Sequence, residues 1–110
     1  MGSETSTGWT FLTSHARVLL CIAGDPGIRL REIGARVGIT ERAAHRIVTD
    51  LCAAGYLSRE RHGRRNRYTI NRQLPIPDPP ARRQRVGDLL ALLTGDQPAT
   101  AAAASEPARG

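Results

Sequence analysis

Lysine is absent from this chain of 110 residues, and all 16 of its basic residues are arginine. Aromatic side chains are also scarce, being limited to Trp9, Phe11, Tyr56 and Tyr68. The chain is rich in alanine, glycine and proline, so we interpret the missing lysine as a trace of GC-rich coding. The positions of the arginines therefore carry more functional information than their number.

Other absences exclude whole classes of protein. No apolar run approaches the roughly 20 residues that a membrane-spanning helix needs, so we expect no membrane partner. The first ten residues lack the charged start and apolar stretch of a secretory signal, which predicts a cytoplasmic, nucleoid-associated protein. Cys21 and Cys52 make neither a disulfide framework nor a zinc cluster, and we expect both to be reduced thiols.

Motifs for catalysis are also missing. The chain has no glycine-rich phosphate loop, no paired catalytic carboxylates and no nucleophile placed beside a base. His15, His45 and His62 are not at metal-ligand spacing from one another or from a cysteine. We therefore expect no enzyme activity, no catalytic residues, no metal and no cofactor.

Positive charge is concentrated in one central block. Residues 29–72 hold 11 arginines and four acids, a net charge of +7, whereas the rest of the chain sums to −1. Such a surplus predicts a polyanionic partner, with nucleic acid the first candidate. Tyr68, Thr69 and Ile70 interrupt the densest arginine run with strand-forming residues, which argues against a disordered basic tail.

A first helix is predicted over residues 15–23, where Thr13 or Ser14 can cap the first turn. A turn at residues 25–27 ends this helix. Residues 28–30 are interpreted either as a single strand or as the lead-in to the next helix. The inward face of the first helix is expected to carry Ala16, Leu19, Leu20 and Ala23.

The next two predicted helices have the pattern of a helix-turn-helix. The second covers residues 31–37 and ends at Gly38, and the third begins after the cap Thr40 and runs to about residue 54. Gly34 allows the two helices to cross closely. Their apolar residues recur at helical spacing and are expected to face inward: Ile33, Val37, Ile39, Ala44, Ile47, Val48 and Leu51.

A β-hairpin is predicted directly after the third helix, with strands at residues 56–61 and 67–71 and a loop at 62–66. Leu57, Tyr68 and Ile70 are its expected core residues. An extended proline-rich connector is predicted at residues 74–80 and a C-terminal helix at 81–93. We thus divide the chain into a winged helix-turn-helix domain at residues 9–73, the connector at 74–80 and the C-terminal helix at 81–93. The two ends, at 1–8 and 94–110, are expected to be disordered.

The predicted fold class is mainly α with a small β-hairpin, a winged helix-turn-helix with an extra C-terminal helix. The chain resembles small bacterial regulators of the MarR and ArsR type in four segments: WTFLTSHARVLL, REIGARVGITERAAHRIVTDLCAAGYL, RERHGRRNRY and VGDLLALL. The resemblance covers residues 9–93 and implies a DNA-binding homodimer that acts on transcription. The third helix lacks the Cys-x-Cys of metal-sensing ArsR members. Full-length MarR proteins have longer flanking helices around a ligand pocket, and we expect no small-molecule ligand here.

The polar face of the third helix is the candidate base-reading surface, because an α-helix fits the major groove of DNA. Arg42 and Arg46 lie one turn apart, and each can pair with a guanine. The alternative is a solvated helix face without function. The base-reading candidates are Thr40, Glu41, Arg42, His45, Arg46 and Thr49.

The hairpin is the candidate wing, whose arginines are suited to a narrow minor groove and to phosphates. Arg29 and Arg31, at the start of the second helix, are candidates for phosphate contacts. The wing candidates are Arg61, His62, Gly63, Arg64, Arg65, Asn66 and Arg67.

The last helix suggests a dimer, because its apolar stripe is too short to be stable alone. The stripe can fold back on its own domain or pack on a second copy, and we favour the second copy. A dimer predicts a pseudo-palindromic operator. Two other functions stay open, a protein-interaction module and a non-specific architectural or RNA-binding protein. The proposed dimer residues are Trp9, Phe11, Val86, Leu89, Leu90 and Leu93.

Overall fold

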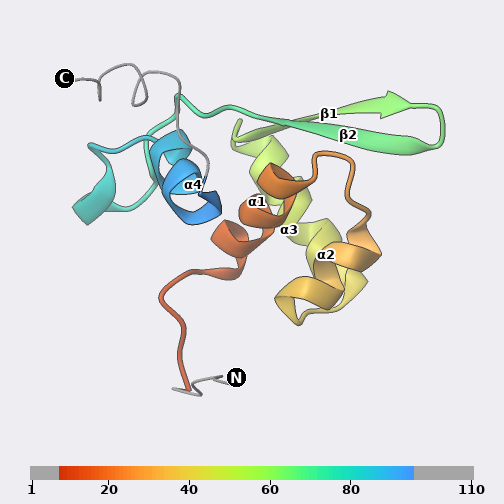
Figure 1. Ribbon diagram of the computed structural model, residues 1–110, viewed down its shortest axis with the longest axis horizontal. Coiled ribbons are helices and arrows are strands. Elements are labelled where there is room, and N and C mark those ends of the chain that lie inside the picture. The colour runs from red at the N-terminus through yellow and green to blue at the C-terminus, as the bar shows by residue number, and fades with distance from the viewer. Residues whose placement is uncertain (1–7, 96–110) are drawn as a thin grey trace.

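The computed structural model describes residues 8–95. Within this range, four α-helices and one two-stranded antiparallel sheet form the winged helix-turn-helix that the sequence predicted, with the additional C-terminal helix (Figure 1). The tails predicted at 1–8 and 94–110 lie outside the described range except for residues 8, 94 and 95. The elements are α1 (Ser14–Gly24), α2 (Leu30–Val37), α3 (Glu41–Ala53), β1 (Leu57–His62), β2 (Arg65–Ile70), a 3-10 helix (Pro79–Ala81) and α4 (Val86–Thr94).

Helix α1 begins at the predicted cap, but its buried face differs in part from the predicted one. The Thr13 hydroxyl accepts a hydrogen bond from the Ala16 N–H at 3.1 Å. The fully buried residues are Val18, Leu19 and Ile22, so the prediction missed Val18 and Ile22. The predicted Leu20 and Ala23 are partly buried and pack against the core.

The predicted corner between α2 and α3 is confirmed. A Cβ atom added at Gly34 would lie 2.7 Å from the Ile39 carbonyl oxygen, so no side chain fits there. Gly38 ends α2 with φ at +83°, a conformation that glycine adopts without steric cost. The Thr40 hydroxyl caps α3 by accepting from the Ala43 N–H at 3.0 Å.

The strands of the wing continue closer to its tip than predicted, and its turn is tighter. Strand pairing runs from Leu57 opposite Ile70 to His62 opposite Arg65, which leaves Gly63 and Arg64 as the whole turn. The predicted loop over 62–66 is therefore wrong. Gly63 has φ at +64°, and a glycine with positive φ permits a two-residue hairpin connection.

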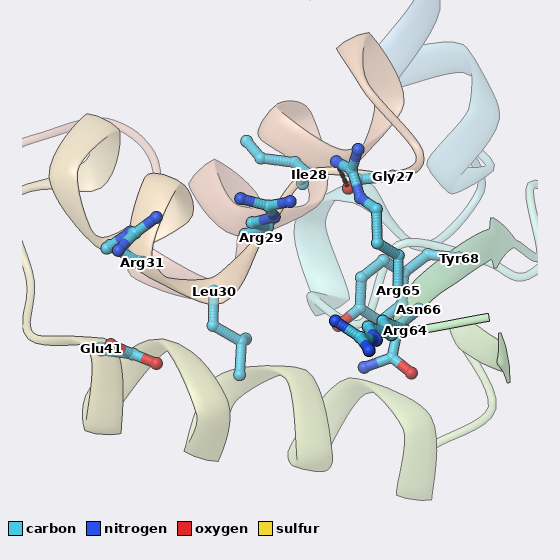
Figure 2. Close-up of a pocket in the computed structure, with 10 residues that line it drawn as sticks. All are labelled: Gly27, Ile28, Arg29, Leu30, Arg31, Glu41, Arg64, Arg65, Asn66 and Tyr68. Carbon is cyan, nitrogen blue, oxygen red and sulfur yellow. Dashed lines mark hydrogen bonds between the residues drawn. The ribbon is translucent and has the colours of Figure 1, made fainter. Parts of the chain in front are cut away.

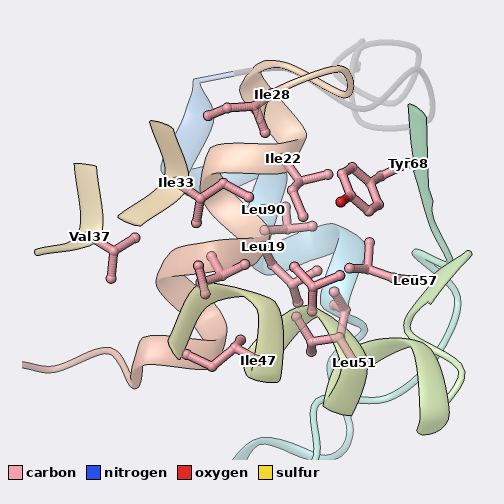
Figure 3. Close-up of a cluster of buried hydrophobic side chains, with 14 residues drawn as sticks. Leu19, Ile22, Ile28, Ile33, Val37, Ile47, Leu51, Leu57, Tyr68 and Leu90 are labelled. Carbon is pink, nitrogen blue, oxygen red and sulfur yellow. The ribbon is translucent and has the colours of Figure 1, made fainter. Parts of the chain in front are cut away.

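One hydrophobic core joins all four helices to the base of the wing (Figure 3). Leu57 and Tyr68 enter this core from the hairpin, as predicted. Helix α4 packs against α1 and contributes Val86 and Leu90, which are 3% and 1% exposed. Their assignment to a dimer interface is wrong, because the buried face of α4 covers its own domain.

The segment between the wing and α4 folds back on itself, so the extended connector predicted over 74–80 is also corrected. Pro75 pairs with Arg85 in a short antiparallel bridge, and the Tyr56 hydroxyl donates to the Pro75 carbonyl at 2.8 Å. Prolines lack an N–H, but their carbonyls still accept hydrogen bonds. The last helix begins at Val86 rather than at residue 81, after the 3-10 helix.

Residues 28–30 form no strand and lead directly into α2, which selects one of the two interpretations of this segment. Between residues 8 and 95, no helix combines the length and apolar character required to cross a bilayer.

Candidate nucleic-acid interface

The outer face of α3 is polar and open to solvent. Ala44, Ile47 and Val48 anchor the helix in the core, which turns the predicted base-reading side chains outward. Arg42 and Arg46 are exposed, and their side chains make no hydrogen bond or ion pair with any residue that the structure describes. Two arginines one helical turn apart are therefore available to an external partner.

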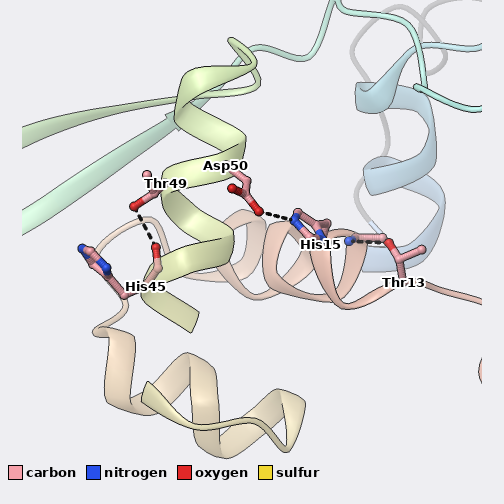
Figure 4. Close-up of polar contacts among 6 residues, drawn as sticks. Thr13, His15, His45, Thr49 and Asp50 are labelled. Atoms are coloured by element: carbon pink, nitrogen blue, oxygen red, sulfur yellow. Dashed lines mark hydrogen bonds and ion pairs between the residues drawn. The ribbon is translucent and has the colours of Figure 1, made fainter. Parts of the chain in front are cut away.

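The two threonines of this face each make a hydrogen bond within the protein, and Figure 4 shows the one made by Thr49. The Thr49 hydroxyl donates to the His45 carbonyl at 2.9 Å, which leaves its oxygen free to accept. The Thr40 hydroxyl accepts from the helix backbone, which leaves its proton to donate. Thr40 therefore suits a phosphate oxygen, whereas Thr49 suits a donor.

An ion-pair position on α3 was missed from sequence. His15 Nε2 on α1 lies 2.9 Å from Asp50 Oδ2 on α3, with the two side chains 47% and 55% exposed (Figure 4). The contact ties the first helix to the recognition helix. Because 35 positions separate the two residues, no local sequence pattern indicates it.

Some polar side chains of the wing contact other residues of the hairpin, whereas others have no partner in the described part of the chain. Arg61 Nε donates to the Gly63 carbonyl at 3.1 Å, and His62 Nε2 lies 3.1 Å from Glu60 Oε1. Arg64 and Arg67 are exposed and have no such partner among the described residues. Arg59 on β1 is likewise exposed and without a partner in the described part of the chain, so the wing carries free arginines on both strands and at its turn.

The structure brings the wing and the start of α2 together around a cleft of about 270 Å³ (Figure 2). Arg65 Nη2 donates to the Gly27 carbonyl at 2.6 Å, and the Tyr68 N–H donates to the Pro26 carbonyl at 2.9 Å. These bonds tie β2 to the loop between α1 and α2. The charged residues that line the cleft are Arg29, Arg31, Glu41, Arg64 and Arg65.

A second cleft of about 460 Å³ lies between residues 10–12, α1 and the end of α2. Arg17 lines it and donates from Nη2 to the Val37 carbonyl at 2.9 Å. Cys21 also lines it, and burial raises the pKa of this thiol against the opposing effect of Arg36 and Arg17. No local sequence pattern predicts this cleft, because its walls come from three separate segments of the chain.

Large apolar side chains remain exposed both in the segment before α1 and on α4. Trp9 and Phe11 pack edge to face with ring centroids 5.0 Å apart and are 59% and 91% exposed. Leu92 and Leu93 on α4 are 78% and 44% exposed. Leu92 was missed because the predicted stripe followed the buried face of α4.

Within residues 8–95, no three histidine, cysteine, aspartate or glutamate side chains lie close enough together to hold a metal ion.

Comparisons with known proteins give a family. The profile of the MarR family matches residues 9–67. Two solved structures are similar at a TM-score of 0.45 each. The PcaV transcriptional regulator from Streptomyces coelicolor, solved with its natural ligand, is 21% identical, with 89% of this chain and 67% of that chain covered. The MarR family transcription regulator SP03579 is 18% identical, with coverages of 90% and 68%.

A search of curated proteins finds no match. The family profile spans more than half of the chain and includes both helices of the helix-turn-helix and most of the wing. The chain therefore belongs to the MarR family, whose members are transcription regulators and not enzymes.

Proposed function

We propose that this chain is a sequence-specific regulator of transcription that binds double-stranded DNA as a homodimer. Helix α3 lies in the major groove, and the wing contacts the minor groove and phosphates. The observation that carries the proposal is the pair Arg42 and Arg46, both exposed and without a partner in the described part of the chain. An unpaired arginine on a groove-sized helix is the side chain best suited to reading guanine.

The neighbouring side chains support base reading. His45 is exposed one position before Arg46, and the free lone pairs of Thr49 can accept from a base donor. Glu41 in the first turn can accept from a cytosine amino group. Together these groups provide donors and acceptors over two turns of one helix.

The wing supplies contacts that do not depend on sequence. Arg64 in the two-residue turn is the outermost free cation of the hairpin, and Arg67 follows on β2. Guanidinium groups bind phosphate in a forked geometry and enter narrow minor grooves. Such contacts supply affinity and orientation, while α3 supplies choice of sequence.

The homodimer rests on the exposed apolar side chains. Trp9, Phe11, Leu92 and Leu93 leave large apolar groups in solvent, and Leu89 on α4 is half-buried. Two copies packed through this surface would present two recognition helices about 34 Å apart. The operator would then be a pseudo-palindrome.

Three arginine variants test the proposal by titration of labelled duplexes. Arg46→Ala is expected to weaken binding to the preferred sequence by roughly 10- to 100-fold and to leave random DNA unchanged. Arg64→Ala is expected to weaken both and to lower the salt slope by about one. Arg82→Ala removes the same charge from the loop before α4 and serves as the control.

Equal losses on preferred and random DNA for both Arg46→Ala and Arg64→Ala would contradict direct reading by α3. Absence of binding to any duplex at micromolar protein would favour a protein-interaction module instead. Stronger binding to folded RNA than to duplex DNA would favour the architectural or RNA-binding alternative.

A further inference from the structure

We propose that the cleft between the wing and the start of α2 binds one phosphodiester group of the DNA backbone, and that Arg65 shapes this cleft without contacting the phosphate. The inference rests on the proposed function and adds to it a site and a division of labour between adjacent arginines. It also changes the role of Arg65, which sequence assigned to direct DNA contact.

The cleft has the charge and size for an anion. Four arginines and one glutamate line its volume of about 270 Å³. Arg29 is the N-cap of α2 and Arg31 lies in its first turn, whereas Arg64 and Arg65 come from the wing turn and β2 (Figure 2). The positive charges therefore converge from two elements that are more than 30 positions apart in sequence.

Three of the four guanidinium groups are free to bind. Arg29, Arg31 and Arg64 are exposed, and their side chains have no hydrogen-bond or ion-pair partner within residues 8–95. A guanidinium offers a planar fork of donors that matches two phosphate oxygens. A phosphodiester entering between α2 and the wing can thus be held from both sides.

Arg65 is different because its guanidinium is already engaged. Its Nη2 donates to the Gly27 carbonyl at 2.6 Å, across the mouth of the loop that leads into α2 (Figure 2). Three residues further along β2, the Tyr68 N–H donates to the Pro26 carbonyl at 2.9 Å. These two bonds fix the distance between the two walls, which makes Arg65 a positioning residue.

Glu41 is the only acid lining the cleft, and it stands in the first turn of α3. Its carboxylate opposes a bound phosphate and limits the attraction of the arginines. It also connects the cleft to the recognition helix, so a phosphate held there fixes the height at which α3 enters the major groove.

The test combines two readouts on the full chain. The first is hydrogen exchange of the wing amides in the protein without DNA. The second is the salt dependence of binding to a duplex of random sequence, which is independent of base reading. The variants are Arg31→Ala, Arg64→Ala and Arg65→Ala, with Arg36→Ala at the far end of α2 as the charge-matched control.

Arg31→Ala and Arg64→Ala are each expected to lower the salt slope by about one and to leave exchange unchanged. Arg65→Ala is expected to speed exchange of the Tyr68 amide by roughly tenfold, the equivalent of one lost hydrogen bond. Arg36→Ala should change neither readout.

An unchanged salt slope for Arg31→Ala overturns the phosphate site, and unchanged exchange for Arg65→Ala overturns its positioning role. Both failures leave the proposed function standing if the wild-type protein still prefers one sequence. If the wild-type protein shows no sequence preference but the variants give the expected salt slopes and exchange rates, the proposed function is rejected and the phosphate site in the cleft is retained. Absence of duplex binding by the wild-type protein rejects both.

Discussion

The wing and helix α4 pack against the same core but leave opposite kinds of side chain in solvent. The outer half of the wing carries Arg64 and Arg67 free of partners in the described structure, whereas α4 exposes Leu92 and Leu93. Both elements bury one face, through Tyr68 in the wing and Leu90 in α4. The buried face of each element therefore attaches it to the core, and the exposed face indicates the kind of partner that the element can bind.

The same contrast extends over the rest of the fold. Residues 29–72, which include α2, α3 and the wing, hold the entire surplus of positive charge. The segments outside this block hold Trp9 and Phe11 and a near-neutral charge balance. One region is therefore suited to a polyanion and the other to a second protein surface, and the two can be changed separately.

The largest expected effect is on the corner that supports the charged region. Gly34→Ala places a Cβ 2.7 Å from a backbone oxygen that cannot move without shifting α3. We expect a loss of about 1–3 kcal/mol in the free energy of unfolding, measured by thermal denaturation. Gly24→Ala, where nothing lies within 4 Å of the added atom, is the control. Equal stability of the two variants would show that α2 and α3 do not pack this closely.

The apolar region is tested by charging α4. Leu92→Asp is expected to weaken self-association by about 2 kcal/mol, because Leu92 is 78% exposed in the single chain and would be buried in a dimer. Sedimentation equilibrium measures the dissociation constant. Gln84→Asp adds the same charge to the exposed loop before α4 and should have no effect. A dimer of unchanged strength in Leu92→Asp would move the interface elsewhere.

A smaller effect distinguishes two roles for Glu41. As the acid of the arginine cleft, it should weaken binding to every duplex, so Glu41→Gln is expected to raise affinity for random DNA about two- to five-fold. If Glu41 instead reads a base, the Glu41→Gln variant is expected to bind the preferred sequence more weakly. Fluorescence anisotropy with both duplexes separates the two results.

The smallest effect is expected at the contact between α1 and α3. His15→Ala removes a half-exposed pair with Asp50, and such surface pairs contribute about 0–1 kcal/mol to stability. Denaturant unfolding should show a shift within that range. A loss above about 2 kcal/mol in the free energy of unfolding would contradict the description of His15 and Asp50 as an ordinary surface pair.

The elements predicted most closely are those whose ends are determined locally. Thr13 and Thr40 cap their helices through bonds to residues three positions away, and Gly38 ends α2 by its own backbone conformation. Each of these signals lies within one turn of the feature that it predicts. For the same reason, the helix-turn-helix was correct to within a residue or two at each end.

The features that sequence did not predict depend on residues far apart in the chain. Arg65 contacts a carbonyl 38 positions away, and His15 contacts a carboxylate 35 positions away. The burial of Leu90 on its own domain depends on how the segment after the wing folds back. Periodicity identifies which face of a helix is apolar, but it does not distinguish a face covered by the same chain from one left for a partner.

Selection of bound fragments from a random pool of duplex DNA tests the central proposal most directly. The expected result is an enriched pseudo-palindrome whose half-sites lie about 10 base pairs apart, one turn of the double helix. Its half-sites should contain the guanines that Arg42 and Arg46 are suited to read. A pool recovered without any enriched sequence would contradict reading by α3 and leave only a non-specific basic surface.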